Sequence, residues 1–151
     1  MAISEIIREL SEMDELKGYY LYLLFYNIDS KKESQEIGFY SPEEKKIKTV
    51  SITNNKALRE EDETMSGEIP VPLQLEKIKL FKEEVMDFLN ERYSLKVSRL
   101  LMILSTEQAI KEPVWTITMM RADNSIYNIK MSAKDGRIIS QGEVSLFGKQ
   151  N

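Results

Sequence analysis

The run WTITMMRADNSIYNIKMSAKDGRIIS, residues 115–140, constrains the possible folds of this chain more than any other feature. WTITMM and IYNIKMS each place apolar side chains at every second position, which is the period of a β-strand with one buried face. ADNS separates these two segments, and AKDG follows the second. Asp135-Gly136 favours a tight turn, because glycine adopts the left-handed backbone conformation without strain. The run therefore predicts an antiparallel meander.

Two other segments show the period of an α-helix. Ile3–Leu16 carries one apolar stripe at spacings of three and four, with charged side chains on the other side. Leu75–Tyr93 shows the same pattern, with Lys and Glu opposite its apolar face. Gly18 fits a C-terminal cap of the first helix, and Pro72 fits the start of the second. We expect one amphipathic helix at the start of each half of the chain.

Further strands are predicted on either side of a break in the pattern at residues 54–73. Tyr19–Ile28 has aromatic and apolar residues at both odd and even positions, which is typical of a strand buried on both faces. Gln35–Tyr40 and Ile47–Ile52 form a hairpin, and Val97–Leu104 adds a strand to the second half. Residues 54–73 combine the acidic run REEDET with a glycine and two prolines, so we interpret them as a linker or long surface loop.

The two halves resemble each other in outline, since each is a helix followed by a meander. Three positions agree when FYSPEEKKIKTVSI is placed beside IKMSAKDGRIISQG: Ser41 with Ser132, Lys46 with Arg137, and Ile47 with Ile138. A duplicated unit is one hypothesis for this agreement. The other is that two hairpins agree by chance.

The second half, about residues 73–142, resembles a PepSY-type domain. The residues that carry the resemblance are Trp115, Tyr127, Ile129, Ala133, Gly136, Arg137 and Ile138. The chain departs from the family pattern at Ser132, where Asp is usual, and at Asp135, where Thr is frequent. The resemblance implies a helix packed across a curled antiparallel sheet, as also in cystatins. It further implies a binding module, such as the PepSY units of metalloprotease propeptides that restrain the protease.

These observations together predict an α+β fold of two helix-plus-antiparallel-meander units, cystatin- or PepSY-like. The first unit, residues 1–53, has a helix and three strands, and residues 54–73 form the linker. The second unit, residues 74–147, is PepSY-like with a helix and four strands. Each helix is expected to pack across its sheet, because the two apolar faces must bury each other. The units could also join into one body through their sheets.

Composition narrows the chemistry. The chain of 151 residues has no Cys and no His, which removes thiol nucleophiles, thiolate–metal sites and the commonest general base. Its net charge of −4 argues against nucleic-acid binding and against docking on an anionic membrane. No apolar run is long enough to span a bilayer, and the N-terminal segment is not a secretory signal. We expect a protein that is not an enzyme and has no cofactor or metal. We expect it to be cytoplasmic, unless a signal or anchor has been removed from the chain.

Each candidate site has a structural alternative. Trp115 could be an exposed interface anchor, but it alternates in step with Ile117 and Met119, which favours a place in the core. The aromatic residues of 19–26 could form a binding face, although a buried central strand is favoured. The acidic residues 60–63 could bind calcium, although a solvated surface is favoured. The hairpin tips are the candidate partner contacts, namely Ser41, Glu43, Lys46, Asp123, Asn124, Lys134, Asp135 and Arg137.

The function expected from the sequence is therefore a non-catalytic protein-binding module that inhibits or restrains a protease or another protein partner. The alternative is a small-ligand-binding or enzymatic domain whose pocket lies between helix and curled sheet, lined by Tyr and carboxylates. A third possibility is a subunit that self-associates through an open sheet edge.

Overall fold

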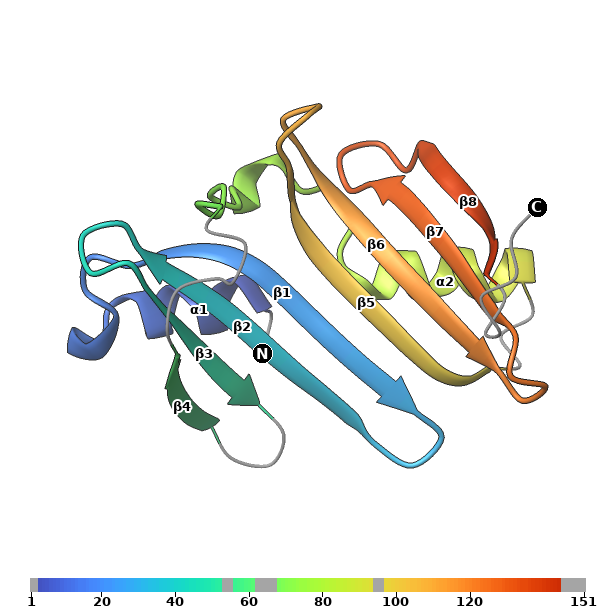
Figure 1. Ribbon diagram of the computed structural model, residues 1–151, viewed down its shortest axis with the longest axis horizontal. Helices are drawn as coiled ribbons and strands as arrows, with labels where there is room; N and C mark the ends of the chain where they lie inside the picture. Colours follow the sequence, from blue (N-terminus) through green and yellow to red (C-terminus); the bar gives the residue numbers. More distant parts are fainter. Residues whose placement is uncertain (1–2, 53–55, 62–67, 94–96, 145–151) are drawn as a thin grey trace.

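Eight strands form one antiparallel sheet in the computed structural model, which describes residues 3–52, 56–61, 68–93 and 97–144 (Figure 1). The order across the sheet is β4-β3-β2-β1-β5-β6-β7-β8. The strands are β1 Tyr20–Asp29, β2 Glu33–Ser41, β3 Lys46–Ile52, β4 Lys56–Glu61, β5 Val97–Glu107, β6 Glu112–Arg121, β7 Ile126–Ser132 and β8 Ile138–Val144. Each pair of consecutive strands within 20–61 and within 97–144 is a hairpin, and the β1–β5 pair joins the two sets.

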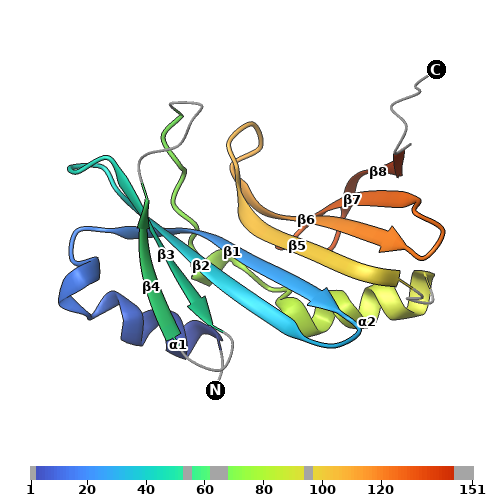
Figure 2. The same ribbon diagram turned by 60° about the horizontal axis from the view of Figure 1, so that its bottom comes forward.

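The helices lie on one face of this sheet. They are α1 Ile3–Ser11 and α2 Lys82–Tyr93, accompanied by the short 3-10 turns η1 Asp14–Leu16 and η2 Leu75–Lys77. Figure 2 shows α1 beneath β1–β3 and α2 beneath the β5–β8 side, and neither of these described helices lies on the opposite face. The helix predicted over Ile3–Leu16 is shorter, because α1 ends at Ser11 and the 3-10 turn η1 follows it. Gly18, predicted to cap that helix, has a φ of +86° and comes two residues after η1.

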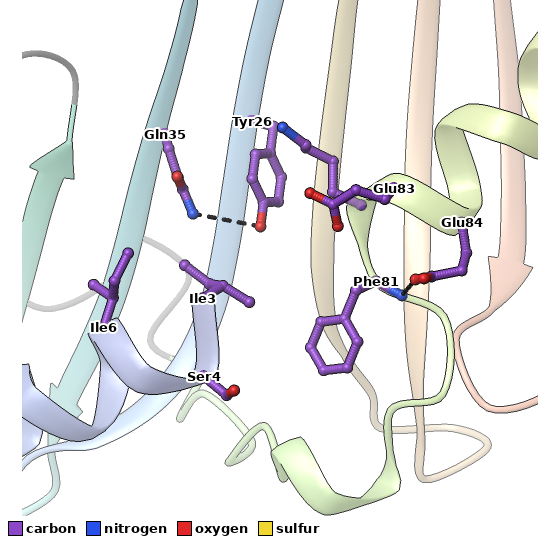
Figure 3. A pocket seen from close by; sticks show the side chains of 9 residues that line it. Ile3, Ser4, Ile6, Tyr26, Gln35, Phe81, Glu83 and Glu84 are labelled. Atoms are coloured by element: carbon purple, nitrogen blue, oxygen red, sulfur yellow. Dashed lines mark hydrogen bonds between the residues drawn. The ribbon is translucent and has the colours of Figure 1, made fainter. Parts of the chain in front are cut away.

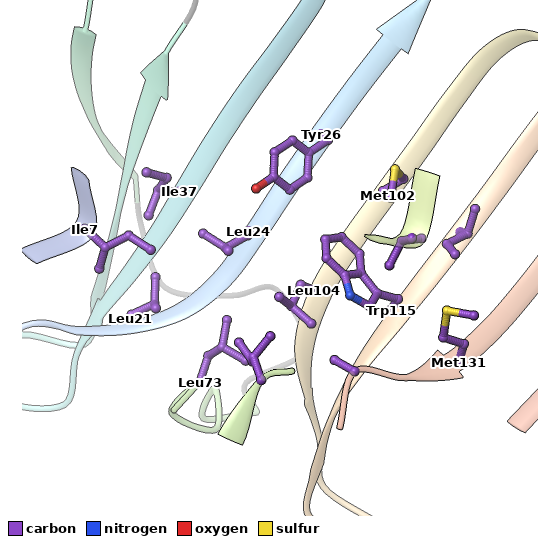
Figure 4. Close-up of a cluster of buried hydrophobic side chains, with 14 of the residues drawn as sticks. Ile7, Leu21, Leu24, Tyr26, Ile37, Leu73, Met102, Leu104, Trp115 and Met131 are labelled. Atoms are coloured by element: carbon purple, nitrogen blue, oxygen red, sulfur yellow. The ribbon is translucent and has the colours of Figure 1, made fainter. Parts of the chain in front are cut away.

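The core fills the space between the helices and the sheet (Figure 4). Leu24, Ile37 and Leu104 are fully buried there, together with Leu89 of α2. Trp115 is also fully buried, and its indole N–H donates to the carbonyl of Leu80 at 2.8 Å. The prediction that this tryptophan belongs to the core is confirmed.

The predicted fold class, two helix-plus-antiparallel-meander units, is wrong, because the sheet is continuous and dominates the structure. β1 pairs with β5 from Leu23↔Ser105 to Asp29↔Arg99, so the two sets of strands share one sheet. The sequence could not show this pairing, because hydrophobic alternation fixes which face a strand buries but not which strand lies beside it. β4 also lies within residues 54–73, where a linker was expected.

Helix α2 begins at Lys82, seven residues later than the predicted start at Leu75. The backbone before it is held by tertiary hydrogen bonds instead. The N–H groups of Lys79 and Leu80 both donate to the carbonyl of Ala133, at 2.9 and 3.0 Å. The Leu80 carbonyl is occupied by the Trp115 indole. These bonds compete with the helical ones, so the apolar period continues through a segment that is not helical.

Residues 70–73, which lie between β4 and η2 in the chain, pass between the ends of β1 and β5. The Leu73 N–H donates to the carbonyl of Leu21 at 2.9 Å, and the Thr106 hydroxyl donates to the carbonyl of Pro72 at 2.9 Å. The Tyr20 hydroxyl donates to the carbonyl of Pro70. Leu73 itself is buried in the core on the helix side. Residues 70–73 therefore form hydrogen bonds with β1 and β5 at the end where these two strands no longer pair with each other.

Three hairpins end in the same four-residue turn. The fourth turn residue has a positive φ in each, and its N–H donates to the carbonyl four residues earlier at 2.7–2.9 Å. These residues are Lys45 (φ 57°), Lys111 (φ 57°) and Gly136 (φ 82°). The prediction of a left-handed Gly136 is confirmed, and all three turns lie at the same end of the sheet.

Candidate functional site

The face of the sheet opposite the described helices, called the open face below, is the first candidate site. Leu24 and Tyr26 of β1 are buried on the helix side, so Phe25 between them points to the open face. The strand register places Ile103 beside Phe25, and Thr118 beside Leu101. Its central side chains are Tyr20, Tyr22, Leu23, Phe25, Tyr40, Leu101, Ile103, Thr116 and Thr118. All of them except the buried Tyr40 are half-buried.

Aromatic rings on β1 and β2 are fitted closely to this face. The rings of Tyr20 and Tyr40 meet edge to face, with centroids 5.7 Å apart. The Tyr22 ring lies against Gly38, where a Cβ atom would stand only 2.9 Å from the ring. A glycine at this position therefore lets an aromatic ring approach the backbone of β2 closely.

A hollow of about 450 Å³ opens at one end of the open face. Tyr22, Pro70 and the β5–β6 turn line it, and Ile69 stands at its rim with 67% of its surface exposed. Ile69 is the most exposed large hydrophobic side chain among the described residues. The hollow could receive a side chain of another molecule.

Charged side chains lie mainly at the margins of the open face. Lys130 of β7 pairs with Glu107 at 3.2 Å, and Arg99 lies opposite Asp29 at the far end of the β1–β5 pair. Glu36 is the acidic residue beside Phe25. The central part of this face on β5 and β6 is thus apolar or hydroxyl-bearing.

The hairpin-tip residues predicted as partner contacts divide between the two ends of the sheet. Ser41, Glu43 and Lys46 lie at the end where the three similar turns gather, and so do Lys134, Asp135 and Arg137 (Figure 1). Asp123 and Asn124, in the β6–β7 turn, lie at the opposite end. Ser41 is 2% exposed, so it offers a partner little surface. The structure brings six of the eight residues to one end and does not unite all of them.

Local hydrogen bonds explain the polar residues of these turns. A hydrogen bond from the Ser125 hydroxyl, followed by one from its N–H, lowers the pKa of Asp123. The Arg137 N–H lowers the pKa of Asp135, and the Arg137 guanidinium pairs with Asp135 at 2.9 Å and with Glu112 at 3.2 Å. These contacts stabilise the hairpins and need no ligand to account for them.

The second candidate site is a cavity of about 430 Å³ on the helix side, called the inter-helix cavity below (Figure 3). Tyr26 of β1 and Gln35 of β2 form its floor. The first turn of α1 contributes Ile3, Ser4 and Ile6, and the start of α2 contributes residues 81–84. The cavity exists because α1 and α2 cover different parts of the sheet and leave the start of each helix facing the other.

Tyr26 dominates the floor of this cavity. It is 3% exposed, and its hydroxyl accepts a hydrogen bond from the Gln35 amide at 3.4 Å. Burial raises the pKa of Tyr26 well above its ordinary value, and the nearby charges of Glu83 and Glu33 add to the effect. The Tyr26 hydroxyl therefore stays protonated and keeps its proton for donation.

The charges around the inter-helix cavity are unevenly paired. Lys82 forms an ion pair with Glu33 at 2.5 Å, with its ammonium group 5.6 Å from the centre of the Tyr26 ring. Glu84 accepts a hydrogen bond from the Phe81 N–H at 2.8 Å and so caps α2. Glu83 has no hydrogen bond or ion pair to any other described residue. Figure 3 shows its carboxylate turned toward the Tyr26 hydroxyl.

The aromatic cluster of residues 19–26 has a mixed outcome. Its strand, β1, is central in the sheet as predicted, but helices cover only one of its faces. Tyr26 faces the core, whereas Tyr22 and Phe25 face the open side. Apolar residues at both odd and even positions indicated two apolar faces, but they did not indicate that the described helices lie on only one of them.

The sequence does not indicate the inter-helix cavity, because its lining comes from four separate elements. No short motif joins Ser4, Tyr26, Gln35 and Glu83. The pocket expected between helix and sheet does contain a tyrosine and carboxylates, but it lies between two helices. Such a juxtaposition depends on the β1–β5 pairing, which the sequence pattern does not reveal.

Two further properties concern the described residues only. Within 3–52, 68–93 and 97–144, no group of three or more acidic side chains is placed to hold a metal ion. The acidic residues 60–63, considered above for calcium, lie outside the residues whose side chains are described. No helix in the described part of the chain has the length and apolarity needed to cross a membrane.

Comparison with known proteins gives one clear structural similarity. No protein-family model matches the chain. No curated protein matches it either. A crystal structure from Clostridium difficile 630, titled a "putative lipoprotein", superimposes with a TM-score of 0.69 at 15% sequence identity. The match covers 93% of this chain and 91% of that one, so the two proteins share their fold over nearly the whole length.

Proposed function

We propose that this chain is a non-catalytic protein-binding module and that it docks its partner on the open face. The observation that carries the proposal is the composition of that face at the centre of the sheet. Aromatic and aliphatic side chains of β1, β2 and β5 lie together there, and both described helices lie on the other side.

The composition of the open face matches that of the buried centre of protein–protein interfaces. Such centres are rich in Tyr, Phe and Met and poor in charge, and they are rimmed by polar residues. Phe25, Leu101 and Ile103 provide the apolar centre, and the Lys130–Glu107 pair lies at the rim. Apolar patches of this kind on a soluble domain mark binding surfaces more often than isolated exposed apolar residues do.

Contacts within the protein already hold the tyrosines of the open face in place, which favours a preformed binding surface. Tyr22 is positioned by its contact with Gly38, and Tyr20 by its ring contact with Tyr40 and its hydrogen bond to Pro70. Side chains that are already ordered lose little conformational entropy when a partner binds. Tyr and Phe so placed are typical anchors of binding energy.

The nature of the partner remains a proposal carried by the residues and the resemblance described above. A folded protein fits a broad sheet face with a hollow at one end better than a small metabolite does. A protease is the first class of partner to test, because PepSY-type units of propeptides restrain proteases. The chain's lack of His and Cys supports a restraining role rather than a catalytic one.

Photo-crosslinking tests the docking surface directly. Benzoylphenylalanine placed at Leu101 samples the open face, and the same group placed at Glu9 samples the exposed side of α1. We expect a partner from source-cell lysate to crosslink from position 101 and not from position 9. Equal crosslinking from both positions, or crosslinking from position 9 alone, would contradict the proposal.

A charge placed on the open face provides the matched functional test. Leu101→Glu should weaken binding of that partner by at least about tenfold, because a carboxylate must then be desolvated in an apolar contact. Ser11→Glu makes the same change in charge at an exposed site on the helix side and should leave binding unchanged. Circular dichroism melts of both variants establish that they remain folded, and light scattering shows whether a second copy of the chain is the partner.

The cellular location is a separate proposal. A cytoplasmic location is expected from the sequence, whereas the structural neighbour is titled a lipoprotein. Fractionation of source cells with an antibody to this chain distinguishes the two. Recovery in the membrane fraction would contradict a cytoplasmic location.

A further inference from the structure

We propose that the inter-helix cavity binds a small organic cation, with the ammonium group beside Glu83 and the apolar body against Phe81 and Tyr26. This inference is independent of the open face, since the cavity lies on the opposite side of the sheet. It rests on the shape of the cavity, the balance of charge around it and the two kinds of surface that line it.

The size and lining of the cavity suit a small organic molecule. Its volume of about 430 Å³ lies within the usual range of roughly 300–1,000 Å³ for ligand pockets. Ile3, Ile6 and Phe81 supply apolar walls, and Tyr26 supplies a buried aromatic floor with a hydroxyl. The other lining residues are polar, and polar groups that converge in a pocket are the usual means of orienting a ligand.

The balance of charge selects a cation over an anion. Lys82 is the basic residue among those that line the cavity, and Glu33 already neutralises it at 2.5 Å. Glu84 is used as the cap of α2, which leaves the carboxylate of Glu83 without a described partner. The start of a helix favours anions, but two glutamates already occupy the first turn of α2 and compensate for that preference. The charged side chains described around the cavity, one lysine and three glutamates, therefore carry a net negative charge.

The aromatic floor reinforces this selection. The ammonium group of Lys82 lies over the Tyr26 ring, 5.6 Å from its centre, so this ring already makes a cation–π contact. The face of an aromatic ring attracts cations electrostatically. The Tyr26 hydroxyl retains its proton and can donate to a ligand oxygen, whereas an ammonium group would use Glu83.

Three probes of similar shape and different charge test the proposal. They are 2-phenylethylamine, which is cationic at pH 7, the neutral 2-phenylethanol and the anionic 3-phenylpropionate. Each is titrated into the full chain labelled with ¹⁵N, and amide shifts report both the affinity and the place of binding. We expect the amine to shift the amides of residues 81–84 and of Tyr26, and to bind at least about fivefold more tightly than either other probe.

A matched pair of variants separates a specific contact from general charge. Glu83→Gln removes the proposed partner carboxylate and keeps its shape, and it should weaken amine binding about fivefold. Glu91→Gln makes the same change on the exposed last turn of α2 and should have no effect. The proposal is overturned if the amine produces no shifts at the cavity at millimolar concentration. Equal binding of the three probes, or equal effects of the two variants, would also overturn it.

Discussion

Replacing Trp115 by Phe should destabilise the protein by about 2–3 kcal/mol. Trp115 is fully buried, and its indole N–H donates to the Leu80 carbonyl at 2.8 Å. Phenylalanine cannot make this bond and leaves a carbonyl unsatisfied, at a cost of about 1–2 kcal/mol. The smaller ring also leaves a void of roughly 40 Å³, which costs about 1 kcal/mol more. Urea denaturation followed by far-ultraviolet circular dichroism measures the sum.

A second aromatic position gives the control for this experiment. Phe39 is equally buried but has no polar side-chain atom, so Phe39→Leu should cost only about 1 kcal/mol. If Trp115→Phe costs no more than Phe39→Leu, the indole hydrogen bond does not contribute as argued. Hydrogen exchange provides a local readout. The amides of Lys79 and Leu80, which bond to the Ala133 carbonyl, should lose more protection in Trp115→Phe than in Phe39→Leu.

The remaining predictions concern Gly38, Lys111, Tyr26 and Asp123. Gly38→Ala should cost about 1–2 kcal/mol in a thermal melt, because its Cβ would lie 2.9 Å from a tyrosine ring carbon, whereas Gly142→Ala meets no atom within 4 Å and should be nearly neutral. Lys111→Gly should stabilise by up to about 1 kcal/mol, since Lys111 has a φ of 57°, and a loss of stability would contradict this. The pKa of Tyr26 is raised in the folded protein, so the protonated hydroxyl contributes to the free energy of unfolding below pH 10, and this contribution is lost at higher pH. The pKa of Asp123 is lowered, so its effect is lost only as the pH falls below its usual range, and NMR titration checks both directions.

Local features of the fold were predictable because they depend on neighbouring residues. Alternation placed Ile117 and Ile129 on the buried face, and both are fully buried. The left-handed conformation of Gly136 followed from the Asp-Gly pair in a hairpin context. Such features are set by sterics and burial within about ten residues, and the sequence contains that information directly.

Features that depend on distant segments could not be predicted in this way. The early start expected for α2 was wrong because the carbonyl of Ala133, more than fifty residues away, binds the amides before Lys82. The β1–β5 pairing joins segments separated by the whole of β2–β4 and α2. Both candidate sites depend on it, since this pairing brings Phe25 beside Ile103 and places α1 near α2. The sequence therefore indicated candidate contacts at the hairpin tips, where its signals were local.

Strand β1 places the two proposed sites on opposite sides of one backbone. Consecutive residues of a strand point to opposite faces, so Phe25 contributes to the open face while Tyr26 forms the floor of the inter-helix cavity. The strand is held on both edges, by β2 and by β5, and such a central strand moves little when one face is occupied. Binding at one site can change the affinity of the other site only if the protein has two conformations and each ligand prefers one of them. A rigid central strand provides no second conformation. We therefore expect Leu101→Glu to leave binding of the amine unchanged and Glu83→Gln to leave binding of the partner unchanged. A change of more than about threefold in either cross-measurement would show that β1 is not the rigid divider that its two-sided pairing implies.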